Sequence, residues 1–111
     1  MESIEKYRTW IKQLLTKYSQ YPYRYGEIES QTIFDIEQDH YQLVRLGWED
    51  QKRVYGCVLH LDIKDRKIWI QWNSSDIDIA EELIGLGVPR EDIVLGFHPA
   101  HLRQFSNYAV S

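Results

Sequence analysis

The sequence predicts a single α+β domain, in which an antiparallel meander of about four strands packs with a long N-terminal helix and a second helix follows the meander. Three observations support this prediction. Near the N-terminus, apolar residues recur at the spacing of a helix. In the middle of the chain, apolar and polar residues alternate as they do in strands. A further helical stripe of apolar residues then follows, with a capping residue before it and a glycine after it. The length of 111 residues suits one domain spanning residues 1–111.

The first predicted element is a helix from Ile4 to Ser19. Its apolar residues recur every three or four positions, as on the buried face of an amphipathic helix: Ile4, Tyr7, Ile11, Leu14, Leu15 and Tyr18. Ser3 is placed to cap the N-terminus, and Pro22 prevents an uninterrupted continuation. Residues 21–26 are therefore predicted to form a connecting loop.

Four strands are predicted next, at Ile28–Glu37, Tyr41–Trp48, Arg53–Ile63 and Lys67–Trp72. The first alternates polar and apolar residues with a period of two, which is typical of a half-buried strand. The third is apolar on both faces from Val54 to Leu61 and should therefore be central. The predicted connections are Gln38-Asp39-His40, the polar residues 49–52, and a tight hairpin turn at Asp65-Arg66.

The second helix is predicted to begin after Ser75, because Ser75 and Asp78 resemble a capping box. Its buried stripe consists of Ile79, Ala80, Leu83 and Ile84. Gly87 can take the left-handed conformation that ends many helices. A turn begun by Pro89 then leads to a short strand at Ile93–Phe97.

Composition and charge disfavour several classes of function. The net charge of −4 lacks the basic excess of nucleic-acid-binding domains, so autonomous DNA binding is disfavoured and no nucleic-acid-binding residue is predicted. We find no signal-peptide pattern at the start and no apolar run that could span a bilayer, so no membrane association is expected. The single cysteine, Cys57, cannot form an internal disulfide, which favours a reducing, cytoplasmic setting.

Two pairs of residues are candidates for chemistry. His60 and Asp62 share one face of a strand and could form the acid–base pair of a small hydrolase or nuclease, but no nucleophile or oxyanion motif accompanies them. The favoured interpretation is that His60 and Asp62 simply lie where this face of the strand leaves the core and becomes polar. His98 and His101 could share a helical face and bind a metal, although Pro99 between them argues against a regular helix there.

Other polar features have structural explanations. Cys57 lies in the middle of a strand without a cationic cluster, which is typical of an inert thiol. An acidic run complements the positive end of the second helix, and a carboxylate metal site is the weaker alternative: Asp76, Asp78, Glu81 and Glu82. We therefore predict no catalytic residue, no metal ligand and no cofactor.

Several motifs resemble the XisI-like family: VLHLDI at 58–63, KIWIQ at 67–71, GVPREDIVLGF at 87–97 and HP at 98–99. The segments DHYQLVRLGW at 39–48 and YAV at 108–110 match as well, so the resemblance covers nearly the whole chain. Members are described as fdxN element excision controlling factors and are found mainly in cyanobacteria. The resemblance implies support for programmed excision of a DNA element during heterocyst differentiation, beside a separate recombinase and a companion factor, XisH.

The resemblance carries no catalytic residue over to this chain. Hairpins of the family often have the sequence K-D-G-K, whereas this chain has Lys64-Asp65-Arg66-Lys67. Arg66 lacks the freedom of glycine at positive φ, so a turn of another type is expected here.

We therefore expect a non-catalytic accessory factor that acts through protein contacts, with an XisH-like companion or with itself, and on DNA only indirectly. Aromatic residues anchor many interfaces, which makes Trp69, Trp72, Tyr21 and Tyr23 the candidate partner contacts. The strand Lys67–Trp72 ends the meander and would leave an edge for pairing with another chain. The alternative is that residues 93–97 cover this edge and both tryptophans belong to the core.

Overall fold

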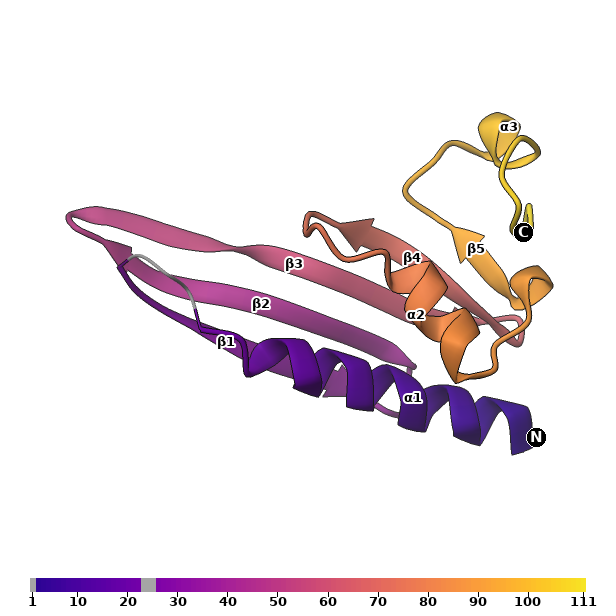
Figure 1. The fold of residues 1–111 in the computed structure, drawn as a ribbon, viewed down its shortest axis with the longest axis horizontal. Helices are drawn as coiled ribbons and strands as arrows, with labels where there is room; N and C mark the ends of the chain where they lie inside the picture. Colours follow the sequence, from indigo (N-terminus) through magenta and orange to yellow (C-terminus); the bar gives the residue numbers. More distant parts are fainter. Residues whose placement is uncertain (1, 23–25) are drawn as a thin grey trace.

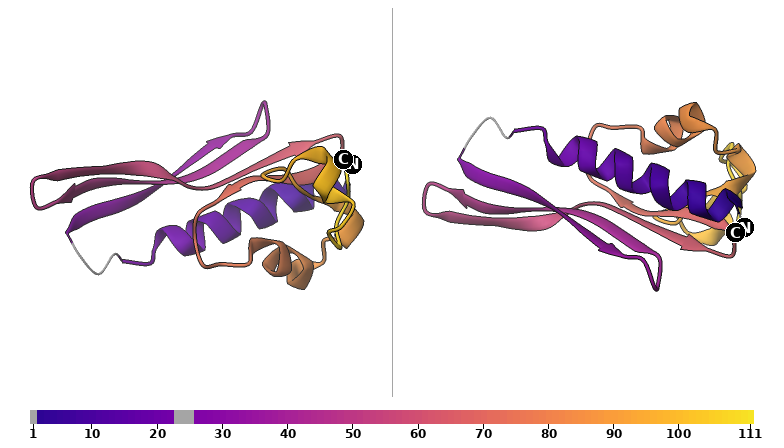
Figure 2. Two further views of the ribbon diagram at one scale, coloured as in Figure 1. Left: turned by 90° about the horizontal axis from the view of Figure 1, so that it is seen from above. Right: turned by 90° about the horizontal axis from the view of Figure 1, so that it is seen from below.

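The computed structural model describes residues 2–22 and 26–111 and confirms the α+β class. One five-stranded sheet carries the helices α1 and α2 on the same face (Figures 1 and 2). The elements are α1 (Glu2–Ser19), β1 (Glu27–Asp35), β2 (His40–Glu49), β3 (Lys52–Lys64), β4 (Lys67–Asn73), α2 (Ile79–Leu86), η1 (Arg90–Asp92), β5 (Ile93–Leu95) and α3 (Ala100–Arg103).

The sheet has the order β1-β2-β3-β4-β5, so β3 is central as predicted. The first four strands form the antiparallel meander, and β5 adds a fifth strand parallel to β4. The register pairs Ile68 with Ile93 and Ile70 with Leu95. The edge of β4 is therefore covered over residues 68–70, and the open edge expected after the meander is not present there.

The core lies between the sheet and the two helices. Helix α1 buries Tyr7, Ile11, Leu14 and Leu15, and α2 buries Ile79, Ala80 and Leu83. The strands supply the opposing layer with Tyr41, Leu43, Leu59, Leu61, Ile63, Ile68, Ile70 and Ile93. The hydroxyl of Tyr7 donates to the carboxylate of Asp92, which also fixes α1 to the short helix η1.

The far end of the sheet is less covered. The β2–β3 hairpin extends past the C-terminal end of α1 (Figure 1). On this arm the side chains of Trp48 and Tyr55 are exposed, and the guanidinium of Arg53 lies over the Trp48 ring. Within residues 2–22 and 26–111, no helix combines the length and apolarity that crossing a membrane demands.

The start of α2 differs from the prediction. The N-cap is Asp78, whose side chain accepts a hydrogen bond from the backbone N–H of Glu81 at 3.2 Å. Ser75 does not cap the helix, because its hydroxyl donates to Asn73 and accepts from the backbone N–H of Ile77. The end of α2 is as predicted: Gly87 has a φ of 121°.

The β3–β4 turn also corrects an expectation. Asp65 and Arg66 have φ values of 53° and 65°, so both central residues have the positive φ that a type I′ turn requires. The expectation of another turn type is wrong. The pairing of Lys64 with Lys67 leaves only two residues for the connection, and the twist of the strands then imposes positive φ even on an arginine.

Candidate functional site

The face of the sheet opposite α1 and α2 carries a group of polar side chains that we call the Asp62 cluster. Its members are His40 and Gln42 from β2, His60 and Asp62 from β3, and Gln71 from β4. The register pairs His40 with Asp62 and Gln42 with His60. Since side chains alternate between the faces of a strand, these residues point away from the core that Tyr41 and Leu61 enter from the other face.

His40 is the member that sequence reasoning missed. The sequence placed it in a turn, but the turn ends one residue earlier and His40 begins β2. The carboxylate of Asp35 accepts hydrogen bonds from the backbone N–H groups of Glu37 and Gln38, both at 3.0 Å. This Asx-type turn closes the hairpin early and brings His40 opposite Asp62. The signal in the sequence was Asp35, an aspartate two residues before the end of the predicted strand.

Asp62 lies at the centre of the cluster. One carboxylate oxygen, Oδ1, lies 2.8 Å from His40 Nδ1 and 2.8 Å from His60 Nε2. The other oxygen accepts a hydrogen bond of 3.1 Å from Gln71 Nε2. An ionised carboxylate only accepts hydrogen bonds, so both facing imidazole nitrogens must carry a proton in this arrangement. Gln42 Nε2 lies 3.5 Å from the remaining ring nitrogen of His60.

The hydrogen bonds decide the charge of the cluster. Burial by itself would raise the pKa of Asp62, but the hydrogen bonds from His40 and His60 outweigh it and hold this pKa below its ordinary value. The hydrogen bond to Asp62 raises the pKa of His40. Asp62 is therefore ionised at neutral pH, and its hydrogen-bond donors in the described part of the chain are the two imidazoles and Gln71.

The predicted pairing of His60 and Asp62 on one strand face is thus present, with a second histidine added. An aspartate can orient a histidine that acts as a general base. However, within residues 2–22 and 26–111 the side chains hydrogen-bonded to this pair come from His40, Gln42 and Gln71, and none of these is a hydroxyl or thiol nucleophile. The arrangement suits the holding of a cation better than covalent catalysis.

The other sequence candidates lie apart from the cluster. His98 precedes α3 and His101 lies within it, and both are exposed. Burial raises the pKa of the half-buried Cys57 thiol, which donates to the carbonyl of Leu59. A neutral thiol at this position agrees with the expectation that Cys57 is inert.

The acidic run on α2 is largely paired. Asp78 is the N-cap, and Glu81 accepts a hydrogen bond from Tyr108 and lies 3.3 Å from Arg90. Glu82 accepts from Tyr18 and lies 3.8 Å from Lys17. These contacts give the carboxylates structural partners, in keeping with the favoured interpretation of the run.

The predicted partner contacts occupy different environments. Trp72 is 52% exposed and pairs with His60 across the strands, so it borders the Asp62 cluster. Trp69 is 9% exposed, and both the ammonium of Lys64 and the guanidinium of Arg103 lie over its ring. Its indole N–H has no acceptor in the described part of the chain. Tyr23 lies outside the described residues.

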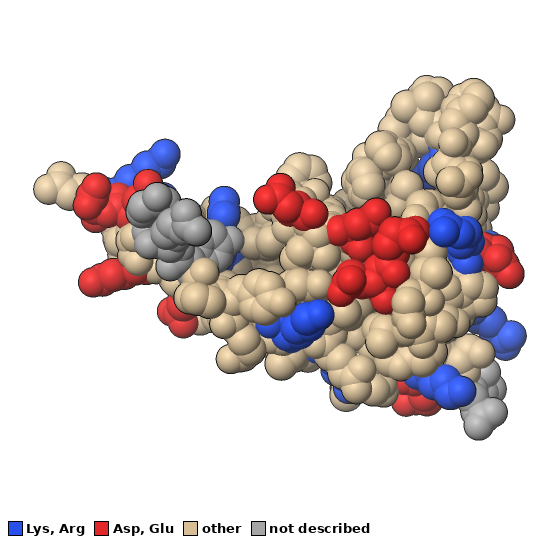
Figure 3. Space-filling view, viewed as in Figure 1, with Lys and Arg blue, Asp and Glu red and all other residues tan. Residues whose placement is uncertain are grey.

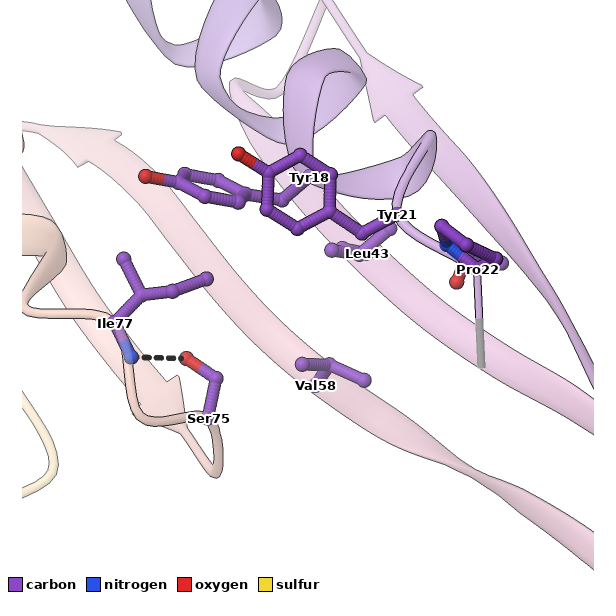
Figure 4. Close-up of a pocket in the computed structure, with 8 residues that line it drawn as sticks. Tyr18, Tyr21, Pro22, Leu43, Val58, Ser75 and Ile77 are labelled. Carbon is purple, nitrogen blue, oxygen red and sulfur yellow. Dashed lines mark hydrogen bonds between the residues drawn. The ribbon is translucent and has the colours of Figure 1, made fainter. Parts of the chain in front are cut away.

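Tyr21 lines a mostly apolar groove on the helical face of the sheet (Figure 4). The groove has a volume of about 220 Å³ and is formed by the end of α1, the strands and the β4–α2 connection. Its lining consists of Tyr18, Tyr21, Pro22, Ser30, Leu43, Val58, Ser75 and Ile77. Tyr21 is 56% exposed and packs edge-on against Tyr18, so it is accessible to a partner.

Several of the described basic residues are engaged in separate contacts. Arg8 is paired with Asp39, Arg53 covers Trp48, and Lys67 reaches the C-terminal residue Ser111. In the view of Figure 3, Lys and Arg are scattered, and the largest charged patch is acidic and lies over α2. This face does not offer the positive surface that a nucleic acid requires.

Comparison with known proteins gives a consistent result. Residues 1–110 match the family described as XisI protein. A XisI-like protein from Anabaena variabilis is 47% identical, with a TM-score of 0.89 and coverage of 96% of this chain and 97% of that one. The crystal structure of the fdxN element excision controlling factor XisI from Anabaena variabilis shares 31% identity and a TM-score of 0.84, over 98% and 99% of the two chains. No protein with a curated description matches.

Proposed function

The chain belongs to the XisI family, and we propose that it is a controlling factor for the excision of a DNA element. The observation that carries this proposal is the end-to-end match to the protein named fdxN element excision controlling factor XisI, at 31% identity. Nearly all of each chain is covered, so the likeness extends to the whole domain. From the family resemblance, we also propose that this excision is a programmed step of heterocyst differentiation and that the protein acts in the cytoplasm.

The proposed role is to support excision without catalysing it. A recombinase that forms a covalent link to DNA needs a placed nucleophile. The Asp62 cluster presents imidazole and amide groups to its carboxylate, and the Cys57 thiol is held neutral by burial. These features favour a regulatory role over a recombinase.

The protein acts through contacts with other proteins, and we propose an XisH-like companion excision factor or a second copy as the partner. The acidic net charge and the scattered basic residues disfavour direct binding to DNA. Exposed aromatic side chains support protein contacts, since these residues are enriched in interfaces. Trp72 on one face of the sheet and Tyr21 in the groove on the other are the accessible candidates.

A genetic experiment tests the excision role. The gene is deleted in a host that carries the element, and excision is measured by amplification across the new DNA junction. The expected result is a loss of junction product that the wild-type gene restores and the Trp72→Ala or Tyr21→Ala genes restore only in part. A Tyr55→Phe gene is the matched control. Unchanged junction product in the deletion strain would contradict the proposed function.

A second candidate function is a small hydrolase or nuclease centred on His60 and Asp62. The observation that favours it is the 2.8 Å contact between His60 Nε2 and Asp62 Oδ1. One measurement on the purified chain, a DNA cleavage assay, distinguishes the two functions. Divalent-metal-dependent cleavage of DNA that disappears in Asp62→Asn would favour the enzyme, whereas equal absence of cleavage in wild type and variant favours the controlling factor.

A further inference from the structure

Three side chains of the Asp62 cluster bring metal-binding atoms to one point. His40 Nδ1, His60 Nε2 and a carboxylate oxygen of Asp62 all lie within 4.8 Å of one another. The residues come from two adjacent strands in the middle of the sheet, where the backbone is fixed by pairing on both sides. Such a rigid frame holds ligands in a constant geometry.

We propose that His40, His60 and Asp62 bind one divalent first-row transition-metal ion of the Zn²⁺ class. Two imidazoles and one carboxylate are ligands that these ions prefer, whereas Mg²⁺ and Ca²⁺ prefer oxygen ligands alone. With three protein ligands, the remaining coordination position is left to water or to a group from a partner.

The present spacing is close to that of a metal site. Bonds from Zn²⁺ to nitrogen and oxygen measure about 2.0–2.2 Å, which separates neighbouring tetrahedral ligand atoms by about 3.3 Å. The two nitrogen–oxygen distances at Asp62 are 2.8 Å. For an ion to replace the two N–H···O contacts, each nitrogen–oxygen pair opens by about half an ångström. The two ring nitrogens, which lie within 4.8 Å of each other, then settle at about 3.3 Å.

Gln71 and Gln42, which surround the three ligands, can keep hydrogen bonds to them when an ion replaces the N–H···O contacts. Gln71 donates to the second oxygen of Asp62 at 3.1 Å and so fixes the carboxylate while its first oxygen binds the ion. Metal binding uses the lone pairs of His60 Nε2 and His40 Nδ1, so the ring proton then lies on Nδ1 of His60 and on Nε2 of His40. Gln42, 3.5 Å from Nδ1 of His60, can follow by presenting its amide oxygen in place of its NH₂ group.

The cluster is also accessible. The side chain of His40 is 52% exposed, that of His60 is 28% exposed and that of Asp62 is 14% exposed. An ion can therefore enter from the His40 side and reach a carboxylate that is mostly shielded from water. The rival explanation is that these three residues form a hydrogen-bonded structural cluster with no affinity for metal.

Metal binding to the purified, chelator-treated full chain separates these explanations. Isothermal titration with Zn²⁺ should show one ion per chain with a dissociation constant of about 10 μM or tighter, while Mg²⁺ shows no binding. Co²⁺ should give the visible absorption of a low-coordinate site with nitrogen and oxygen ligands.

Variants locate the site. His40→Ala should weaken Zn²⁺ binding at least tenfold, and the exposure of His40 makes this variant the one that best preserves the fold. Gln71→Ala should weaken Zn²⁺ binding by about 10- to 100-fold, because the Asp62 carboxylate loses the hydrogen bond that orients it. His101→Ala is the control that should leave binding unchanged, because among the described residues the gathered ligand atoms belong to His40, His60 and Asp62 alone.

Two outcomes would overturn the proposal. One is the absence of stoichiometric Zn²⁺ binding by a wild-type chain whose circular dichroism shows it to be folded. The other is binding that His40→Ala leaves intact, or that His101→Ala removes. Because this experiment uses neither DNA nor a companion protein, its result is independent of the excision role.

Discussion

The hydroxyl of Tyr18 donates a hydrogen bond to the carboxylate of Glu82, with 2.6 Å between the two oxygens. This contact joins the last turn of α1 to α2 across 64 positions of the chain. It also raises the pKa of Tyr18 to about 12, since the hydrogen bond favours the protonated phenol and burial adds to the effect. The two helices on this face of the sheet are thereby tied to each other as well as to the strands.

Tyr18→Phe should lower the free energy of unfolding by about 1 kcal/mol at pH 8, which is the usual net value of one such hydrogen bond. A folded-state pKa raised above the unfolded value stabilises the protein below pH 10, and this stabilisation is lost as the pH rises through about 12. The stability difference between wild type and variant should therefore shrink over this range. Urea unfolding at several pH values measures it, with the exposed Tyr55→Phe as control. A difference that grows with pH would contradict this account.

Leu83→Asp should unfold the domain. Leu83 is fully buried in α2, and an unpaired buried carboxylate costs several kcal/mol against a typical domain stability of about 5–15 kcal/mol. Leu86→Asp on the same helix is the matched control, because Leu86 is 37% exposed. Circular dichroism and thermal melting measure both variants. An unchanged melting temperature for Leu83→Asp would mean that α2 does not pack as described.

Arg66→Gly should stabilise the protein by about 1 kcal/mol. Arg66 has a φ of 65°, which costs a residue with a Cβ about 1–2 kcal/mol and costs glycine little. Arg66→Ala is the control, since it removes the charge and keeps the Cβ, and it should bring no gain. Denaturant midpoints compare the three proteins. Equal stability of the Gly and Ala variants would show that φ at this turn is not the limiting factor.

Sequence periodicity was sufficient for most of the fold. The 3.6-residue spacing of apolar residues located α1, and the two-sided apolar run placed β3 at the centre of the sheet. Both signals arise from burial, which affects many residues at once. The parallel pairing of β5 was not predictable in the same way, because three apolar residues carry no information about strand direction.

The features that the sequence placed wrongly, the N-cap of α2 and the position of His40, depend on single hydrogen bonds. Ser75 and Asp78 are both good caps, and the sequence does not show that Asn73 engages the Ser75 hydroxyl. The Asp62 cluster was half predicted for a similar reason. The strand period put His60 and Asp62 together, but the place of His40 depends on where Asp35 closes the preceding turn.

The purified chain should bind DNA no more tightly than the non-specific level, with a dissociation constant of about 10⁻⁴ to 10⁻⁶ M at physiological salt. The net charge of −4 and the pairing of Arg8 with Asp39 leave little positive potential for phosphates. Fluorescence anisotropy with labelled duplexes measures the affinity. Nanomolar, sequence-selective binding by the chain alone would contradict this prediction.

Light scattering of the purified chain at micromolar concentration, with and without the companion excision factor, measures directly whether the protein acts through protein contacts. The expected mass is above that of the 13.3 kDa monomer, as a homo-oligomer or as a complex with the companion. Trp72→Ala should weaken this assembly with the fold intact, because Trp72 is 52% exposed, whereas Leu86→Ala serves as an exposed control on the other face. A strict monomer that does not bind the companion factor would contradict the proposed action through protein contacts.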